Sequence, residues 1–180
     1  SIKDIKVVGD HNIQNIMIAI CMAKVCHVKT EILTNVISSF IGVEHRIEFV
    51  REIDGIKIYN DSKATNTDAS IIALKAFKQP VILLMGGFDK GLDLEEISTY
   101  HASIKKLITF GAAGERFQKD MHINNSVYAG DLQEATTLAM EEAEVGDIIL
   151  LSPSTSSFDA YKSYEERGNV FKEIVNNYRR

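Results

Sequence analysis

Short apolar runs alternate with stretches of helical spacing over most of this chain. The apolar runs predict buried strands near residues 81–85, 105–110, 126–128 and 147–151. Apolar positions of helical period follow each run and predict helices near residues 93–102, 112–119, 131–143 and 165–178. Strands and helices that alternate in this order are typical of an α/β protein whose open, mostly parallel sheet carries helices on both faces.

Two strands without a helix between them precede this alternation. Alternating apolar residues predict strands over residues 47–53 and 56–58, and Asp54-Gly55 supplies a tight hairpin turn between them. Such a hairpin is antiparallel, and mixed sheets often carry an antiparallel strand at one edge. We therefore expect a Rossmann-like sheet with an antiparallel edge hairpin, followed by a helix that is capped by Asn66 or Thr67.

The first part of the chain has a different pattern, which predicts a short helical segment. Residues 5–9 predict a short strand. Two helices follow, one from a cap at Asp10 to about residue 26 and the other from a cap at Thr30 to about residue 40. Because these elements are too few to form a core of their own, we interpret residues 1–42 as the end of a domain that lies mostly outside this sequence. Residues 43–180 then form a second domain.

Composition and charge narrow the class of function. The chain has 180 residues, 45% of them hydrophobic, which suffices for the core of one domain or slightly more. A formal net charge of −5 argues against a nucleic-acid partner, which needs a basic face. No apolar stretch is long enough to cross a bilayer, so we expect a cytoplasmic protein without a membrane partner. Cys21 and Cys26 have neither redox nor zinc spacing, and we expect both to pack in a core.

Three of the predicted strands lead into loops that are rich in hydroxyl groups, glycines and lysines. These loops are Asp61–Asn66, Gly86–Gly91 and Ser152–Phe158. The carboxyl ends of parallel strands lie at one edge of a sheet, so neighbouring strands would bring the loops together. Each loop taken alone could equally be a solvated connection with a helix cap.

The loops offer cations at Lys63 and Lys90 and hydroxyl groups at Thr65 and Ser157. A small dicarboxylate suits this set, because each carboxylate prefers one cation and several N–H or O–H donors. The glycines over 86–91 lack the spacing of a nucleotide phosphate loop, and the sequence contains neither a nucleophile elbow nor a metal-ligand motif. An enzyme fragment and a non-catalytic module that binds a small anion or nucleotide therefore both stay open.

Five motifs, in their order along the chain, resemble those of the Mur ligase family. They are Gly9-x-His11-Asn12-x-x-Asn15, His45-Arg46-x-Glu48, Asp61–Asn66, Gly86–Gly91 and the stretch from Leu151-Ser152-Pro153 to Arg167-Gly168. The last three resemble the family's C-terminal domain, and they are most similar to the branch that adds D-glutamate. The resemblance spans essentially the whole chain. It implies that residues 1–42 close the central ATP-binding domain and that residues 43–180 form the C-terminal, D-glutamate-binding domain.

The reaction that this resemblance implies is ATP-dependent amide-bond formation in peptidoglycan biosynthesis. ATP, with Mg²⁺, phosphorylates the carboxylate of UDP-N-acetylmuramoyl-L-alanine, and the amine of D-glutamate attacks the resulting acyl phosphate. The family's phosphate loop, its metal-binding carboxylates and its uridine-binding domain have no counterpart in this sequence. We therefore expect the chain alone to be inactive and to depend on the missing domains as partners.

The resemblance also implies roles for individual residues. The ATP contacts would be made by Asn12 and Asn15 at the adenine, Arg46 at the phosphates and Asp61 at the ribose hydroxyls. The D-glutamate contacts would be made by Lys63, Thr65, Lys90, Ser157, Phe158 and Tyr164. Among these, Lys63, Lys90 and Ser157 are the central candidates. No catalytic residue and no metal ligand is implied within this chain.

Ordinary structural roles stay open for several of these residues. Asn12 could serve the first turn of its helix, Asp61 could cap a turn, and Ser157 could cap a helix. Arg46 and Glu48 could form a surface ion pair of little energetic weight. Arg167 could lie on a solvated helix face or brace the loop after the last strand.

One departure from the family pattern affects the substrate loop. Ser154-Thr155-Ser156 stands where we expect small apolar residues, which adds hydroxyl groups without much volume. Other ligases of this family add other amino acids, and folylpolyglutamate synthase adds L-glutamate. The Asp61–Asn66 loop is the feature that favours D-glutamate over these alternatives.

Overall fold

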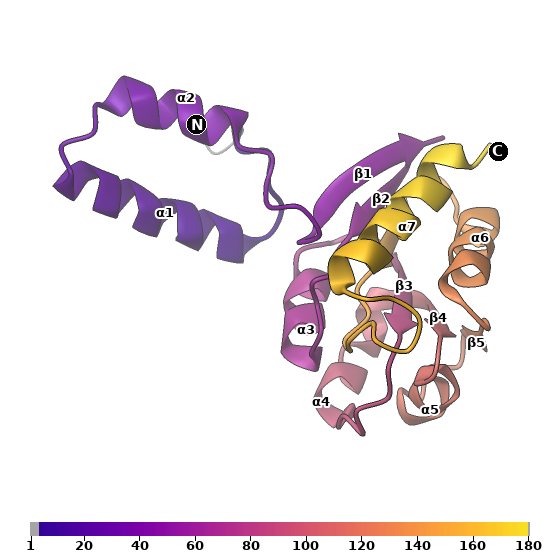
Figure 1. The fold of residues 1–180 in the computed structure, drawn as a ribbon. Coiled ribbons are helices and arrows are strands. Elements are labelled where there is room, and N and C mark those ends of the chain that lie inside the picture. The colour runs from indigo at the N-terminus through magenta and orange to yellow at the C-terminus, as the bar shows by residue number, and fades with distance from the viewer. Residues whose placement is uncertain (1–3, 180) are drawn as a thin grey trace.

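A computed structural model describes residues 4–179 and contains an α/β domain from which two helices extend (Figure 1). The strands are β1 (Glu48–Ile53), β2 (Ile56–Asn60), β3 (Val81–Gly86), β4 (Ile104–Phe110), β5 (Ser126–Tyr128) and β6 (Ile148–Leu151). The helices are α1 (Asp10–Val25), α2 (Thr30–Ser39), α3 (Thr67–Lys75), α4 (Glu95–Ser98), α5 (Gly114–Asp120), α6 (Leu132–Glu142) and α7 (Tyr164–Asn177). A short 3₁₀ helix, η2 (His101–Ser103), leads into β4.

The strands form one sheet in the order β1-β2-β6-β3-β4-β5. β1 and β2 pair antiparallel, and the other neighbouring pairs are parallel. The prediction of an open, mostly parallel sheet with an antiparallel edge hairpin is confirmed. β6, the last strand along the chain, lies between β2 and β3, so the loops that follow these three strands are neighbours.

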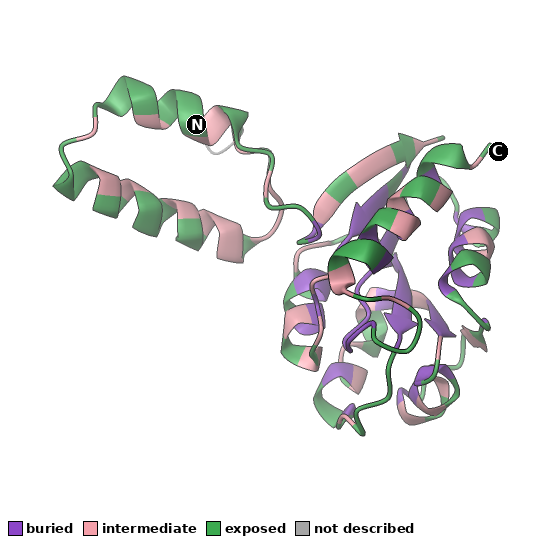
Figure 2. Cartoon of the chain, in the orientation of Figure 1, coloured by how far each residue is buried: buried purple, intermediate pink, exposed green. Residues whose placement is uncertain are grey.

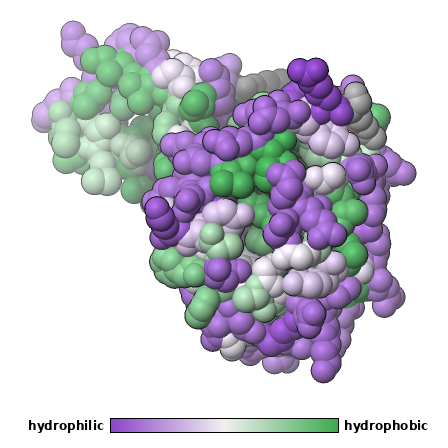
Figure 3. Space-filling model, turned by 45° about the vertical axis from the view of Figure 1, so that its right-hand side comes forward, coloured by the Kyte–Doolittle hydropathy of each residue, from purple (hydrophilic) through white to green (hydrophobic). Residues whose placement is uncertain are grey.

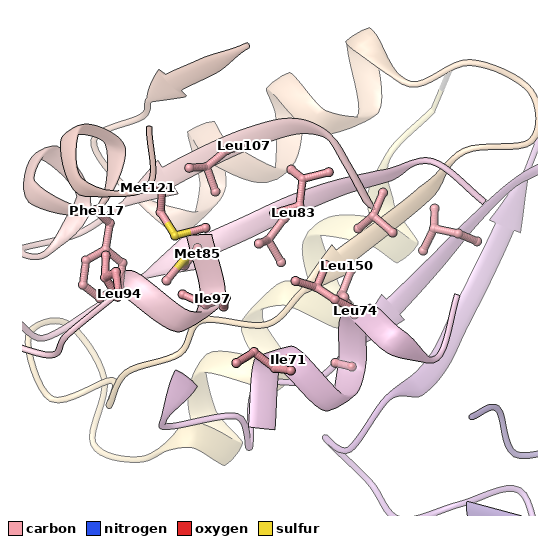
Figure 4. Packing of buried hydrophobic residues seen from close by; sticks show 14 of the residues in the cluster. Ile71, Leu74, Leu83, Met85, Leu94, Ile97, Leu107, Phe117, Met121 and Leu150 are labelled. Carbon is pink, nitrogen blue, oxygen red and sulfur yellow. The ribbon is translucent and has the colours of Figure 1, made fainter. Parts of the chain in front are cut away.

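Alternate residues of the central strands face opposite sides of the sheet and enter two separate cores. Leu83 and Met85 of β3 pack against side chains from α3, α4 and α5 (Figure 4). Ile82 and Leu84 of the same strand pack with α6 and α7 on the other face. Helices therefore cover both faces, as predicted. Full burial of each such side chain contributes about 2 kcal/mol, so the central strands form a rigid base for the loops at their ends.

Local hydrogen bonds decide where the helices begin and end. The cap predicted at Asn66 is confirmed, since its side chain accepts from the Ala69 amide at 2.8 Å. The helix predicted over residues 93–102 is much shorter, because α4 covers only Glu95–Ser98. The Ser98 and Thr99 hydroxyls donate back to helix carbonyls at 2.7 Å, which offers the backbone an alternative to a longer helix.

The helical extension departs from the prediction in three details. Residues 5–9 form no strand. Gly9, with a φ of 91°, takes the capping position of α1, so Asp10 is the first residue of the helix and caps nothing. α2 likewise begins at Thr30 itself, after an extended Lys29, and the Thr30 hydroxyl accepts from the Lys24 ammonium at 2.6 Å.

α1 and α2 contain no buried residue, and apolar side chains are exposed along them (Figures 2 and 3). Their large apolar residues with more than half of their surface exposed are Met17, Ile18, Met22, Val25, Ile32 and Val36. Cys21 and Cys26 are also exposed, so the prediction that both pack in a core is wrong. An apolar face can be recognised from its spacing, but its packing partner cannot, and neither buried core of residues 4–179 includes a residue of these helices.

Gly86, the last residue of β3, should tolerate no side chain. Its φ of 149° is rare for L residues, and a Cβ at this position would lie 2.8 Å from the Phe110 backbone nitrogen of β4. We expect Gly86→Ala to lower the free energy of unfolding by more than about 3 kcal/mol in urea titrations, because both backbones are fixed by the sheet.

Gly146 provides the matched control, since its φ is also positive, at 95°, but a Cβ there meets no atom within 4 Å. Gly146→Ala should cost about 1 kcal/mol, the strain of the backbone alone. Equal losses for the two variants would contradict the close approach of β3 and β4.

Candidate functional site

The loops that follow β2, β3 and β6 meet at one end of the sheet. The Phe88 amide donates to Ser156 O at 2.9 Å, and the Thr155 hydroxyl donates to Phe88 O at 2.6 Å. The Lys90 ammonium donates to Thr65 O at 3.3 Å, which joins the loop after β3 to the loop after β2. The three loops that were predicted to converge therefore do so.

Arg167 of α7 contacts all three loops from a fully buried position. Its guanidinium donates to the Ser62 hydroxyl at 3.0 Å and to Ser62 O at 2.9 Å. It also donates to Thr155 O at 3.0 Å and to Gly86 O at 3.4 Å. Burial lowers the pKa of Arg167 to about 10, so the side chain stays charged at pH 7. Of the two roles considered from the sequence, the solvated helix face is wrong and the bracing role is confirmed.

Asp61, at the start of the loop after β2, is 4% exposed. Its Oδ1 accepts from the Ile47 amide at 3.2 Å, and its Oδ2 accepts from the Ser152 hydroxyl at 2.8 Å. Ser152 Oγ lies 2.8 Å from Ser70 Oγ, which lies 2.8 Å from Ser154 Oγ. Burial raises the pKa of Asp61 to about 7, although its hydrogen bonds oppose the shift. The carboxyl group thus fastens the linker before β1 to the loop after β6, rather than capping the turn that follows it.

A buried histidine holds the same linker against β2. His45 has a φ of 63°, and its Nδ1 lies 3.0 Å from the side-chain nitrogen of Asn60. That nitrogen also donates to Glu48 at 3.0 Å. Glu48 pairs with Lys172 of α7 at 3.3 Å, so the surface ion pair considered between Arg46 and Glu48 is not the one that forms. Burial lowers the pKa of His45, which favours the neutral imidazole.

The two candidate lysines have different surroundings. The Lys63 amide donates to His45 O at 3.0 Å, and its ammonium lies 5.5 Å from the centre of the Tyr164 ring, a cation–π distance. The Lys90 side chain instead reaches across to Thr65. The lysines therefore project from loops that touch, and each ammonium has a separate neighbour.

Ser156 and Ser157 are buried, and their hydroxyl oxygens have no hydrogen-bond partner among residues 4–179. A buried hydroxyl group without a partner is costly, and a polar ligand can remove that cost. Phe158, the next residue, is 69% exposed. The loop after β6 therefore presents unpaired hydroxyl groups beside an exposed aromatic ring.

Ser157 does not cap a helix, so that alternative is wrong. Its carbonyl accepts from the Tyr161 amide at 2.8 Å in an isolated turn, and α7 begins only at Tyr164. Ser163 is the cap, because its hydroxyl accepts from the Glu166 amide at 3.3 Å. The Lys162 amide, one residue before the cap, donates to the Glu166 carboxylate at 2.6 Å, so two hydrogen bonds fix the start of α7.

Two of the four residues expected at ATP, Arg46 and Asp61, line a small pocket at the start of the loop after β2. The pocket has a volume of about 50 Å³ and is lined by His11, Arg46, Ile47, Asp61, Lys63, Ala64, Ala69 and Ile72. Arg46 and Asp61 therefore lie together. Asn12 donates to Val8 O at 2.7 Å and so serves the first turn of α1, while Asn15 is exposed one turn further along.

Of two arginines near the loops, the sequence pattern indicates the burial of one but does not indicate the partner of the other. Arg167, Phe171 and Val175 are spaced by four residues and share the buried face of α7, so the helical spacing marks Arg167 as buried. Arg116 pairs with Asp89, which is 27 residues away in sequence, at an Nη2–Oδ1 distance of 2.7 Å. No periodicity in the sequence indicates that pair, because it depends on the arrangement of β3 and α5.

The part of the chain that the structure describes contains neither a candidate metal cluster nor a candidate membrane-spanning helix. Residues 4–179 contain no cluster of three or more His, Cys, Asp and Glu side chains that could hold a metal ion. None of the helices formed by these residues combines the length and the apolar character that crossing a membrane requires.

Comparison with known proteins identifies the family. The model of the "Mur ligase, glutamate ligase domain" matches residues 45–155, and the chain therefore belongs to the Mur ligase family. A Desulfitobacterium hafniense protein named UDP-N-acetylmuramoylalanine–D-glutamate ligase is 46% identical over 93% of this chain and 38% of its own length. A Thermoanaerobacter protein of the same name is 40% identical over 99% of this chain. The chain spans 41% of the length of that relative.

Solved structures support the fold. UDP-N-acetylmuramate-alanine ligase MurC from Thermotoga maritima aligns with a TM-score of 0.70 at 14% identity, over 96% of this chain and 39% of that one. MurF ligase from the same organism, solved in complex with ADP, aligns with a TM-score of 0.61 at 15% identity, over 87% of this chain and 36% of that one. The arrangement of strands and helices is therefore that of Mur ligases.

Asp61 should make the stability of the chain depend on pH. Its pKa is about 7 in the folded protein against an ordinary 3.8, so the folded state binds this proton more tightly than the unfolded state. The stability that this bound proton contributes is complete below the unfolded pKa of 3.8 and is lost as the pH rises from there to about 7. The loss is on the order of 4 kcal/mol.

Asp61→Asn has no proton to lose and should remove this component. Urea unfolding of both proteins from about pH 4 to pH 8 isolates it, because other titrating groups cancel in the difference. We expect the free energy of unfolding of the native protein, minus that of the variant, to fall with increasing pH. A difference that stays constant would contradict the buried, proton-holding state of Asp61.

Proposed function

We propose that this chain is the C-terminal part of an ATP-dependent ligase that joins D-glutamate to UDP-N-acetylmuramoyl-L-alanine in peptidoglycan biosynthesis. The observation that carries the proposal is the junction of three loops on the Arg167 guanidinium, with Lys90 and the unpaired Ser157 hydroxyl in those loops. Relatives named for this ligase, at 40–46% identity, support D-glutamate as the amino acid.

The proposed task of these loops is to hold both carboxylates of the amino acid. Lys63 and Lys90 would each neutralise one negative charge, and Thr65 and Ser157 would donate hydrogen bonds. Phe158 and Tyr164 would close the apolar side of the pocket. With both carboxylates fixed, the amine is the group that stays free to attack an acyl phosphate. The bond that forms joins the amine nitrogen to the acyl carbon, and phosphate leaves.

The proposed nucleotide contacts form only one side of a site. Asp61 and Arg46 fit the ribose and the phosphates by charge and hydrogen-bonding capacity, and Asn12 and Asn15 fit the adenine edge from α1. The pocket that Asp61 and Arg46 share holds about 50 Å³, whereas ligand pockets measure roughly 300–1,000 Å³. Carboxylates for Mg²⁺ are not clustered among residues 4–179, so no step is assigned to a metal on this chain.

The domain assignment is also a proposal. Residues 1–42 would end a central ATP-binding domain, and residues 43–180 would form the C-terminal domain. The exposed apolar residues of α1 and α2 support this division, because large apolar patches generally mark a surface that another part of a protein covers. The same division would leave the chain alone without turnover.

The experiment that tests the function uses the full-length protein that contains this chain. We expect it to release phosphate from ATP only when both UDP-N-acetylmuramoyl-L-alanine and D-glutamate are present. Lys90→Ala should raise the KM for D-glutamate about 10- to 100-fold, because a charge-assisted contact to a carboxylate is lost. The KM for ATP should stay within about twofold, since Lys90 lies outside the pocket of Asp61.

Lys78 is the matched control for Lys90. It is exposed and precedes β3, whereas Lys90 follows the opposite end of that strand. Lys78→Ala should leave every kinetic constant unchanged. Phosphate release that depends on a different amino acid, or an unaltered KM for D-glutamate in Lys90→Ala, would contradict the proposed function or the proposed site, respectively.

A further inference from the structure

The loop that carries Lys90 is held from outside by one arginine of α5. Arg116 contacts the Asp89 carboxylate with two nitrogens, Nε to Oδ2 at 2.9 Å and Nη2 to Oδ1 at 2.7 Å. Two parallel hydrogen bonds between a guanidinium and a carboxylate fix orientation as well as distance. Asp89 directly precedes Lys90 in the chain, so the Arg116–Asp89 pair fixes the position of the backbone at Lys90.

The same guanidinium holds the other limb of the loop. Arg116 Nη1 donates to Leu92 O at 3.0 Å, two residues after Lys90. Asp89 Oδ1 also accepts from the Gly91 amide at 2.8 Å, which closes a tight turn around Lys90. Lys90 therefore lies at the tip of a loop whose two limbs are fastened to one side chain.

Arg116 is itself well anchored. Its Nη1 donates to Asp120 Oδ2 at 3.1 Å, one turn along α5. The next residue, Phe117, is fully buried in the core cluster that also contains Met85 (Figure 4). A rigid helix therefore supports the guanidinium, and through it the loop after β3.

We infer that Arg116 is a positioning residue for the amino-acid substrate: it fixes the Lys90 loop over the loop after β2 and neutralises Asp89, so that Lys90 can bind a carboxylate. The inference rests on the proposed function, in which Lys90 contacts D-glutamate. Arg116 does not need to touch the substrate for this role.

Charge gives Arg116 a second effect on the same site. Without its guanidinium, the carboxylate of Asp89, the residue next to Lys90, would lose its cationic partner. Asp89 is ionised at neutral pH even at its ordinary pKa of 3.8, which Arg116 lowers further, so without Arg116 its carboxylate would repel the two carboxylates of the amino acid. Loss of Arg116 should therefore weaken binding both by freeing the loop and by leaving negative charge beside it.

An alternative role is that of a surface ion pair that only adds stability. The side chains of Arg116 and Asp89 are 30% and 35% exposed, and exposed pairs contribute little to folding. That role predicts a small change in unfolding and no change in kinetic constants. The positioning role predicts a selective change in the KM for D-glutamate, so kinetics separate the two.

The test uses the full-length protein with ATP, UDP-N-acetylmuramoyl-L-alanine and D-glutamate. Arg116→Gln should raise the KM for D-glutamate about tenfold, while kcat and the KM for ATP stay within about twofold. Arg116→Lys, which keeps the charge but not the paired hydrogen bonds, should lie between the native protein and Arg116→Gln. An unchanged KM for D-glutamate in Arg116→Gln would overturn the inference.

Asp89 supplies a rescue that a purely structural role would not produce. Adding Asp89→Asn to Arg116→Gln removes the unpaired carboxylate and should recover part of the lost affinity for D-glutamate. An equal or higher KM in the double variant would overturn the electrostatic component.

Arg51 is the matched control arginine, since it contacts carbonyls at the end of α7 from the opposite edge of the sheet. Arg51→Ala should leave the KM for D-glutamate unchanged, and an equal rise in both arginine variants would overturn the inference.

Failure of the inference differs from failure of the proposed function. In the former, the native protein uses D-glutamate and Lys90→Ala raises its KM, but Arg116→Gln does not. In the latter, the native protein does not use D-glutamate.

Discussion

The buried guanidinium of Arg167 is the interaction on which the geometry of the candidate site depends. It joins Ser62, Gly86 and Thr155, which follow or end three neighbouring parallel strands. Its hydrogen-bond acceptors are carbonyl and hydroxyl oxygens, so dipoles stabilise its charge at close range. The acceptors around this buried charge are held in place, because moving any one of them away would leave an N–H group of the ion without a hydrogen bond in a buried position.

Two further contacts extend this constraint to the surrounding segments. Asp61 ties the linker before β1 to the loop after β6 through Ile47 and Ser152. Arg116 ties the loop after β3 to α5, on the outer side of the same junction. The groups proposed to bind the substrate are thus supported by Arg167 and Arg116, whereas Phe158 is exposed and the Ser157 hydroxyl has no hydrogen-bond partner among residues 4–179. Rigid support around unsatisfied binding groups is the arrangement expected of a preorganised site.

The sequence predicted those features that depend on local pattern. Apolar runs gave the strands, Asp54-Gly55 gave the hairpin, and the family motifs marked the loops. Contacts between distant segments were not predictable in this way, because neither the insertion of β6 between β2 and β3 nor the pairing of Arg116 with Asp89 leaves a periodic signal. The exposure of Cys21 was not predictable either, because the sequence marks an apolar helix face but not its packing partner, and α4 is short because side-chain hydrogen bonds compete with the helix.

Hydrogen exchange in an Arg167→Lys variant of this chain tests the central claim most directly. A lysine keeps the charge but cannot reach the acceptors of three loops at once. We predict that the Phe88 amide, which bonds to Ser156 O, and the Lys63 amide, which bonds to His45 O, exchange at least about tenfold faster. Amides in the centre of β4 should keep their native rates. Unchanged exchange in the loops, or equal acceleration throughout the sheet, would contradict the role of Arg167 as the group that joins them.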